Sequence, residues 1–224
     1  MVMKYLFWFT CMLAWSCGDA QHEHHHHGHD ANHHMNQRPF GELVAHFEDP
    51  ARDEWQQPDA VMARLGDLNG KTVMDIGSGT GYFSFRMARA GARVICADVD
   101  QRFLDYIMQK RDSIGSWAAD RISTRLVPFD SADLQPGEAD LVLIVDTYHH
   151  IEDRVAYFRQ VRQGLTSGGK LVVIDFFKEE APVGPPVEMK MAEETVMDEL
   201  HQAGFEHVAV DVETLPYQYI ITVW

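Results

Sequence analysis

The stretch Val73–Phe83, VMDIGSGTGYF, decides the fold that this sequence predicts. An apolar run comes first, glycines then stand at the alternate positions Gly77, Gly79 and Gly81, and a segment with a helical pattern follows. Glycines at such a junction let a ligand lie directly against the main chain at the amino end of the helix. The stretch therefore predicts a strand, a ligand-binding loop and a helix in succession.

Strand and helix patterns continue to alternate after this stretch. Apolar runs typical of buried strands cover 72–76, 92–98, 124–129, 139–145 and 170–177, and helical patterns cover 82–90, 101–111, 154–165 and 193–203. The final runs, 207–213 and 217–224, are joined by a short turn and are expected to form an antiparallel pair at one edge. The pattern predicts an α/β fold with a Rossmann-like doubly wound seven-stranded sheet, mostly parallel with an antiparallel C-terminal edge strand.

Composition limits the size of the domain and the kind of partner. The chain has 224 residues, of which 46% are hydrophobic, so one well-buried domain is expected, and we assign it to residues 40–224. The formal net charge of -15 and the lack of any Lys/Arg run make nucleic acid a poor partner. We expect a monomer that acts on a small-molecule substrate.

The first residues have the layout of a secretory signal. Lys4 precedes an apolar stretch, Tyr5–Ser16, that is too short to span a bilayer as a mature helix. The ending before Cys17 resembles a bacterial lipoprotein signal, which implies a signal peptide over residues 1–16, lipidation of Cys17 and a lipid anchor in the cell envelope, on the periplasmic or outer-membrane side. Trp15 departs from the small residue usual there. An ordinary signal peptide or an uncleaved anchor is the alternative.

Residues 17–39 are expected to be a flexible tail rich in histidine, because the tract has no apolar periodicity. Eight of the thirteen histidines lie between His22 and His34. The candidate ligands for zinc, copper or nickel are His24, His25, His26, His27, His29, His33 and His34. A soluble spacer is the alternative, and an expression tag is less favoured because other residues interrupt the tract.

Further motifs join the glycine loop. A dinucleotide-binding loop would carry a third glycine where this sequence has Tyr82, whereas Asp75 and Asp98 end the first two predicted strands. Together with VICADVD, FDSADL, ADLVLIVDTYHHI and LTSGGKLVVID, the loop resembles the motifs of class I S-adenosylmethionine-dependent methyltransferases from about Val61 to Trp224. A nicotinamide oxidoreductase is disfavoured by Tyr82.

The resemblance implies a cofactor site for S-adenosylmethionine. The glycines would line its methionine moiety, Asp98 would hold the ribose, and Asp130 with Ser131 would flank the adenine. The full set of expected cofactor-binding residues is Asp75, Gly77, Ser78, Gly79, Gly81, Tyr82, Asp98, Val99, Asp130, Ser131 and Asp146.

The candidates for catalysis follow the fourth predicted strand. They are Asp146, Tyr148, His149 and His150. A sulfonium methyl is already activated, so the protein must align the acceptor, and a hydroxyl or carbon acid also needs a base. His149 or His150 is the expected base; the alternative is a capping or packing role. On an extended segment the two imidazoles would point to opposite faces and could not form a metal pair.

Two open questions concern the surroundings of the site. Residues 46–58 and the Pro-rich residues 181–190 are expected to shape the substrate pocket or to act as simple connectors. An envelope metal-binding protein with a non-catalytic methyltransferase fold is the alternative function. Because S-adenosylmethionine is made in the cytoplasm, a cytoplasmic location is the alternative to the envelope.

Overall fold

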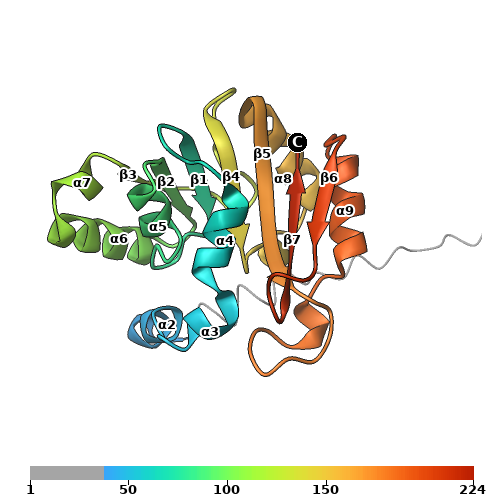
Figure 1. The fold of residues 1–224 in the computed structure, drawn as a ribbon, viewed down its shortest axis with the longest axis horizontal. Coiled ribbons are helices and arrows are strands. Elements are labelled where there is room, and N and C mark those ends of the chain that lie inside the picture. The colour runs from blue at the N-terminus through green and yellow to red at the C-terminus, as the bar shows by residue number, and fades with distance from the viewer. Residues whose placement is uncertain (1–37) are drawn as a thin grey trace, which may run out of the picture.

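A computed structural model describes residues 38–224 as a sheet covered by helices on both faces (Figure 1). The seven strands lie in the order β3-β2-β1-β4-β5-β7-β6. They are β1 (Thr72–Ile76), β2 (Arg93–Asp98), β3 (Ile122–Leu126), β4 (Ala139–Val145), β5 (Leu165–Phe176), β6 (Val208–Asp211) and β7 (Gln218–Val223). The predicted seven-stranded α/β architecture is confirmed.

Strands β1 to β5 run parallel, and β7 is antiparallel to both of its neighbours, β5 and β6. The antiparallel strand is therefore second from the edge, and β6 is the edge strand. The register pairs Asp175 with Tyr219 and Phe176 with Gln218. As a result, the start of β7 lies beside the carboxyl end of β5.

The helices are α2 (Phe40–Phe47), α3 (Arg52–Gln56), α4 (Pro58–Leu65), α5 (Ser84–Arg89), α6 (Gln101–Ile114), α7 (Ser116–Ala119), α8 (Arg154–Gly164) and α9 (Glu193–Gln202), with 3₁₀ turns η1 (Tyr148–His150) and η2 (Val187–Met189). Asp100 caps α6, because its side chain accepts a hydrogen bond from the Arg102 amide at 2.9 Å. Asp153 caps α8 in the same way, through the Ala156 amide at 3.3 Å.

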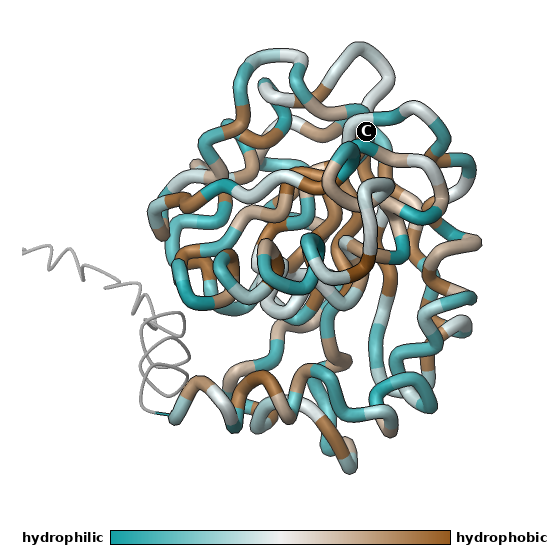
Figure 2. Tube along the Cα trace, turned by 90° about the vertical axis from the view of Figure 1, so that its left-hand side faces the viewer, coloured by the Kyte–Doolittle hydropathy of each residue, from teal (hydrophilic) through white to brown (hydrophobic). Residues whose placement is uncertain are grey.

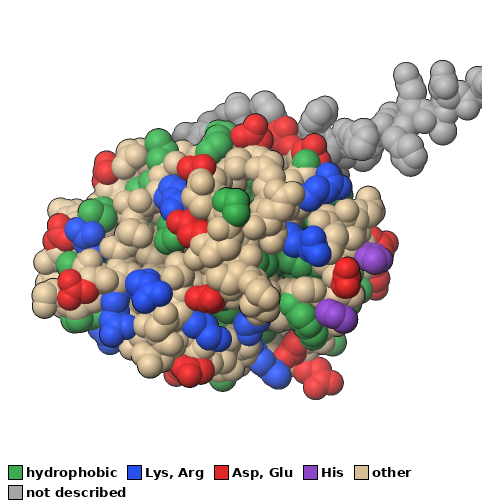
Figure 3. All heavy atoms as spheres, turned by 90° about the horizontal axis from the view of Figure 1, so that it is seen from above, with side chains coloured by type: hydrophobic (Ala, Val, Ile, Leu, Met, Phe, Trp, Pro, Cys, Tyr) green, Lys and Arg blue, Asp and Glu red, His purple; other side chains and the backbone are tan. Residues whose placement is uncertain are grey.

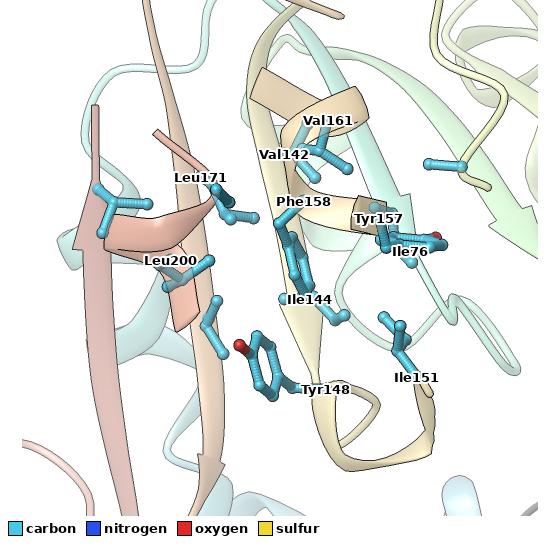
Figure 4. Close-up of a cluster of buried hydrophobic side chains, with 14 of the residues drawn as sticks. Ile76, Val142, Ile144, Tyr148, Ile151, Tyr157, Phe158, Val161, Leu171 and Leu200 are labelled. Carbon is cyan, nitrogen blue, oxygen red and sulfur yellow. The ribbon is translucent and has the colours of Figure 1, made fainter. Parts of the chain in front are cut away.

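Two apolar clusters hold the layers together. One joins the sheet to α4, α5 and α6 through residues such as Leu65, Met87 and Ile107. The other joins the opposite face to α8 and α9 and includes Phe158 and Leu200 (Figure 4). The strands at the centre of the molecule are accordingly its most apolar segments (Figure 2). Burial of both sheet faces explains the continuous apolar runs of the sequence.

Some boundaries differ from the sequence prediction. Strand β3 begins two residues early, because Ile122 is buried and pairs with Val94, whereas Phe129 is 57% exposed beyond the strand. Helix α8 ends at Gly164, where an added Cβ would collide with the Leu134 side chain, and β5 begins at once. Helices α2, α3 and α4 were not predicted as helices.

The carboxyl ends of the parallel strands define one end of the molecule. Helices α2 and α3 and the loop 177–192 lie at this end, and the last residue of the chain lies at the opposite end (Figure 1). Among the described helices, none combines the length and apolarity needed to cross a bilayer. The predicted signal peptide, Cys17 and the histidine tract lie outside the described residues.

Candidate active site

The glycine loop connects β1 to α5 and has a backbone that requires glycine. The φ angles of Gly77, Gly79 and Gly81 are 69°, 51° and 80°, in the left-handed region. A Cβ on Gly77 would collide with the Thr147 side chain, and one on Gly81 would lie 2.8 Å from Phe85 Cε2. The loop can therefore pass close to its neighbours only without side chains at these positions.

Two hydroxyls of the same loop are buried without a protein partner. They are Ser78 Oγ and Thr80 Oγ1, and among the described residues no other buried side-chain nitrogen or oxygen lacks a hydrogen bond. Leaving a buried hydroxyl unpaired costs about 1 to 3 kcal/mol, so such groups concentrate where a ligand completes the site. The bare glycines and the unpaired hydroxyls fit a loop that receives a polar cofactor.

Asp98 ends β2 beside this loop and is nearly buried. One carboxylate oxygen accepts the Gly79 amide hydrogen bond at 2.9 Å, and the other accepts the Asp100 amide at 3.0 Å. Burial raises the pKa of Asp98 to about 6. Each oxygen keeps lone pairs that can accept ribose hydroxyls, and the apolar Val99 next to it is 40% exposed. This geometry suits the predicted ribose contact.

Asp75, by contrast, is turned toward the helix that follows the loop. Its carboxylate accepts a hydrogen bond from Ser84 Oγ at 2.5 Å, joining β1 to the first residue of α5. Burial raises the pKa of Asp75 to about 7. The contact indicates that Asp75 fixes the angle between strand and helix beneath the loop.

The expected adenine side follows β3. Asp130 is exposed, and Ser131 Oγ donates a hydrogen bond to Gln160 Oε1 at 2.9 Å while accepting the Asp133 amide. Phe129, directly before them, presents an exposed aromatic ring that can pack on a base. The sequence did not indicate this residue, because Phe129 ends an apolar run that predicted a strand as far as residue 129, whereas β3 ends at Leu126.

Asp146 follows β4 in a strained backbone conformation, with φ 52°. Its carboxylate accepts a hydrogen bond from the Gln218 amide, and the Arg52 guanidinium lies 3.7 Å away. Gln56 in turn donates to Gln218 at 2.6 Å. Burial raises the pKa of Asp146 to about 7. The polar chain thus connects β4 and β7 with helix α3.

Helix α3 also contacts the other side of the loop. The Arg52 guanidinium lies over the ring of Tyr82, 4.1 Å from its centre, and the Tyr82 hydroxyl donates a hydrogen bond to Asp53. Arg86 stacks on the same ring at 4.0 Å. Residues 46–58, expected to shape the pocket or merely to connect, therefore lie against two predicted site residues, Tyr82 and Asp146. We call α2 and α3 the lid helices.

The four residues predicted for catalysis separate in the structure. Tyr148 is part of the core under α8, where it stacks on Phe158 at 4.8 Å and its hydroxyl donates to Glu199 at 2.7 Å (Figure 4). The expected extended conformation of this segment was wrong, because Tyr148–His150 forms a 3₁₀ turn. The imidazoles of His149 and His150 therefore lie 4.4 Å apart instead of on opposite faces.

His149 has a partner, Asp175, that the sequence did not indicate. Its Nδ1 lies 3.0 and 3.1 Å from the two carboxylate oxygens of Asp175, at the carboxyl end of β5. Burial lowers the pKa of His149, but the Asp175 and Asp146 carboxylates together outweigh it, and the net shift is upward. Burial and His149 lower the pKa of His150 to about 3. The one available signal was a carboxylate inside the apolar run KLVVIDFF.

The other pocket segment, residues 181–190, belongs to the loop after β5. Lys190 is buried, its Nζ donates to the Glu179 carbonyl at 2.7 Å, and it lies over the Phe176 ring at 5.3 Å. Trp55 of α3 packs on the same ring at 5.5 Å. Lid and loop therefore meet at Phe176. Within residues 38–224, no group of three His, Cys, Asp or Glu side chains is placed to hold a metal ion.

Comparison with known proteins agrees with this geometry. Residues 74–173 match the family described as "Methyltransferase domain". A SAM dependent methyltransferase from Aquifex aeolicus has a TM-score of 0.75 at 23% identity, covering 84% of this chain and 98% of that one. An S-adenosylmethionine dependent methyltransferase from Mesorhizobium loti has a TM-score of 0.61 at 18% identity, covering 74% and 95%. The fold is shared with these enzymes.

Curated relatives match at the level of sequence. Proteins named tRNA U34 carboxymethyltransferase from Alteromonas mediterranea and Shewanella sp. (strain W3-18-1) are 30% and 31% identical over 137 residues. The match covers 60% of this chain in both cases, and 41% and 40% of the relatives. The chain thus spans about two fifths of the length of the curated relatives it matches.

Proposed function

We propose that this chain, which carries a methyltransferase domain on the class I fold, transfers the methyl group of S-adenosylmethionine to a small-molecule acceptor. The observation that carries the proposal is the loop Gly77–Gly81 beside Asp98. The loop has glycines with left-handed backbone, two buried hydroxyls without a protein partner, and a neighbouring carboxylate. A nucleoside could hydrogen-bond to these hydroxyls and to the carboxylate.

The residues of the chain divide the work of such a transfer. S-adenosylmethionine supplies a methyl group that is activated by its sulfonium sulfur. Asp98 would accept hydrogen bonds from the ribose, and the loop main chain would support the methionine moiety. Asp146 offers a further carboxylate at this end of the sheet, and the Arg52 guanidinium, close to Asp146 and stacked on Tyr82, holds α3 against the glycine loop. The lid helices exclude water and align the acceptor, which is the main requirement of a displacement at carbon.

The choice of a small molecule rests on charge. The chain carries a formal net charge of -15, and an RNA backbone needs clustered cations for affinity. At the site end, Arg52 is engaged by Asp146 and Gln56, Arg86 by Asp53, and Lys190 is buried. At the opposite end of the molecule, basic and acidic side chains are interspersed (Figure 3). The curated relatives are named for tRNA, so tRNA is the alternative acceptor that the experiment must include.

We further propose that the chain is held in the cell envelope through Cys17 and that its histidine tract captures zinc, copper or nickel. The support is the short apolar stretch before Cys17 and the eight histidines that follow it. Both features precede the described residues.

The test is methyl transfer from isotopically labelled S-adenosylmethionine to two separate pools, the small-molecule fraction of a bacterial extract and total tRNA. The label should appear in a small molecule with the wild-type chain and not with Asp98→Ala. Asp105→Asn, a surface carboxyl on α6, serves as the matched control. Label found only in tRNA would overturn the proposed small-molecule acceptor and leave the methyltransferase activity standing. No transfer to either pool would overturn the proposed activity, whether or not the chain binds the cofactor.

A further inference from the structure

A buried carboxylate and an imidazole face each other at the carboxyl ends of two neighbouring strands. Asp175 has 0% exposure, and its two oxygens lie 3.1 and 3.0 Å from His149 Nδ1. The Phe176 amide donates a further hydrogen bond to Asp175 Oδ1 at 2.8 Å. The Asp175 carboxylate is thus held by two partners, the Phe176 amide and the His149 imidazole.

The sheet itself has no need for a carboxylate at this position. Residues 171–174 of β5 and Phe176 are buried apolar side chains, and a buried charge without partners is costly. When the Asp175 carboxylate accepts the hydrogen bond, Nδ1 of His149 carries the proton, and Nε2 of the neutral imidazole keeps its lone pair. Enzymes orient an imidazole for proton transfer in this way: a carboxylate binds one ring nitrogen, and the other ring nitrogen acts as the base.

The pair belongs to the same end of the sheet as the lid helices. The charged groups that act on His149 are Asp175 of β5, Asp146 after β4 and Arg154 of α8, and His150 is its neighbour on η1. Arg52 of α3 acts on Asp146. Asp175 and Asp146 favour the imidazolium, so the pair can hold a proton once it has been taken up.

We propose that His149 is the base that removes the proton of a hydroxyl acceptor, that Asp175 is the positioning residue that orients it, and that the methylated atom is therefore an oxygen. This inference rests on the proposed function. The hydroxyl oxygen forms a bond to the methyl carbon, the bond between that carbon and sulfur breaks with its electrons going to sulfur, and the hydroxyl proton passes to His149 Nε2. The imidazolium later releases this proton to water.

The class of acceptor can be inferred from the kinds of nucleophile that need a base. A thiol of ordinary pKa is partly ionised near neutral pH and needs little help, whereas an alcohol or phenol is a poor nucleophile until its proton leaves. A fixed His–Asp pair is therefore useful mainly for alcohols and phenols. The presence of the pair therefore indicates an oxygen acceptor.

The experiment compares His149→Gln and Asp175→Asn with His201→Gln and Asp198→Asn, matched substitutions of exposed residues on α9. The substrate is whatever small molecule of the bacterial extract the wild-type chain labels. Mass spectrometry identifies the methylated atom. Calorimetry with S-adenosylhomocysteine reports whether each variant still binds cofactor, and ¹⁵N NMR of histidine-labelled wild type reports the tautomer of His149.

We expect methylation on oxygen and a loss of about 100-fold or more in kcat for His149→Gln, with cofactor affinity and KM little changed. Asp175→Asn should lower kcat about 10- to 100-fold and move the acidic limb of the pH profile to lower pH, because it removes the anion that favours the imidazolium. The α9 variants should behave as wild type. The NMR spectrum should show a proton on Nδ1 of neutral His149.

Three results would overturn the inference. The first is labelled sulfur or nitrogen as the only product. The second is unchanged kcat in His149→Gln or an unshifted pH profile in Asp175→Asn. The third, which needs no variant to fold, is neutral wild-type His149 protonated on Nε2. If the wild-type chain binds cofactor but labels nothing, the proposed function fails and this inference fails with it.

Discussion

The ring of Phe47, from lid helix α2, covers Gly79 of the glycine loop, since a Cβ placed on Gly79 would lie 3.4 Å from Phe47 Cδ2. The same ring stacks on Phe103 of α6 at 5.6 Å. Glu48, the next residue, pairs with Lys110 of α6 at 2.8 Å. Helix α2 is therefore docked over the loop by contacts that can be weakened one at a time.

Phe47→Ala should loosen this docking. An aromatic pair contributes about 0.5 to 1.5 kcal/mol, which corresponds to about a two- to tenfold change in the closed population. We expect the cofactor product to dissociate faster by about this factor. Stopped-flow fluorescence of Trp55 in α3, which packs on Phe176, can follow the lid. Ile114→Ala, at the far end of α6, is the control; equal rates in Phe47→Ala and wild type would contradict a lid role.

Asp98→Ala should weaken cofactor binding without unfolding the sheet. Hydrogen bonds to a charged acceptor contribute about 1.5 to 3 kcal/mol, so affinity should fall about ten- to a hundredfold. Titration calorimetry with S-adenosylmethionine and S-adenosylhomocysteine measures the change, and NAD should not bind to the wild type. An unaltered dissociation constant in the variant would remove the ribose assignment.

The buried Asp75 makes stability depend on pH. Its pKa is raised by burial to about 7 in the folded chain, above the ordinary value near 4 that applies when the chain unfolds. The folded state therefore holds the proton more tightly, and stability falls as pH rises from about 4 to about 7. The loss is at most about 4 kcal/mol, because each tenfold difference in proton affinity is worth about 1.4 kcal/mol.

Asp75→Asn should remove the contribution of Asp75 to this dependence and leave those of Asp98 and Asp146, and the amide oxygen can still accept the Ser84 hydrogen bond. Urea unfolding at pH 5 and pH 8 gives the free energies of unfolding to compare. The difference between the two pH values should shrink in Asp75→Asn and persist in Asp105→Asn. A variant that keeps the wild-type difference would show that folding does not raise the pKa of Asp75.

Metal capture and cofactor binding should be separable. The sequence places the histidines before the first helix of the domain, and within residues 38–224 there is no metal-ligand group. Deletion of residues 18–36 should therefore abolish most zinc, copper or nickel binding and leave cofactor affinity unchanged. Metal and cofactor titrations on both forms, with a chelator control, make the comparison. A loss of cofactor affinity beyond about tenfold, or about 1.4 kcal/mol, would place the tail in the active site.

Cys17→Ser should release the chain from the membrane fraction or leave it unprocessed if Cys17 is the lipidated residue. Fractionation of cells and the mass of the mature N-terminus give the answer. Cys96→Ser is the matched control, because Cys96 is buried in β2. Identical processing and fractionation of Cys17→Ser and wild type would contradict the lipid anchor.

The sheet and the glycine loop could be predicted because local chemistry fixes them. Buried parallel strands need continuous apolar runs, and the left-handed backbone at Gly77, Gly79 and Gly81 tolerates little else. The lid helices were missed because α3 is only five residues long and is held by its polar contacts to Tyr82, Gln218 and Asp146. Such contacts join residues far apart in the chain and leave no periodic trace.

The catalytic candidates show the same limit. Proximity to the fourth strand suggested Tyr148 and both histidines, but the 3₁₀ turn directs Tyr148 into the core. Asp175 could not be predicted as a site residue, because a single carboxylate within an apolar run has no sequence neighbour that indicates a function. Its role depends on the neighbouring strand end, from which His149 reaches it. The assignments of individual site residues stay predictions.

The antiparallel course of β7 has a practical consequence. Because Gln218 starts the strand at the lid end and the chain then runs back through the sheet, Trp224 emerges at the far end, 49% exposed and stacked on His207 (Figure 1). A fluorophore, affinity handle or sensor surface attached there stays a full strand length away from the lid helices. Immobilisation through the carboxyl terminus would thus present the carboxyl ends of the parallel strands to solution, whereas coupling near Phe40 would tether a lid helix.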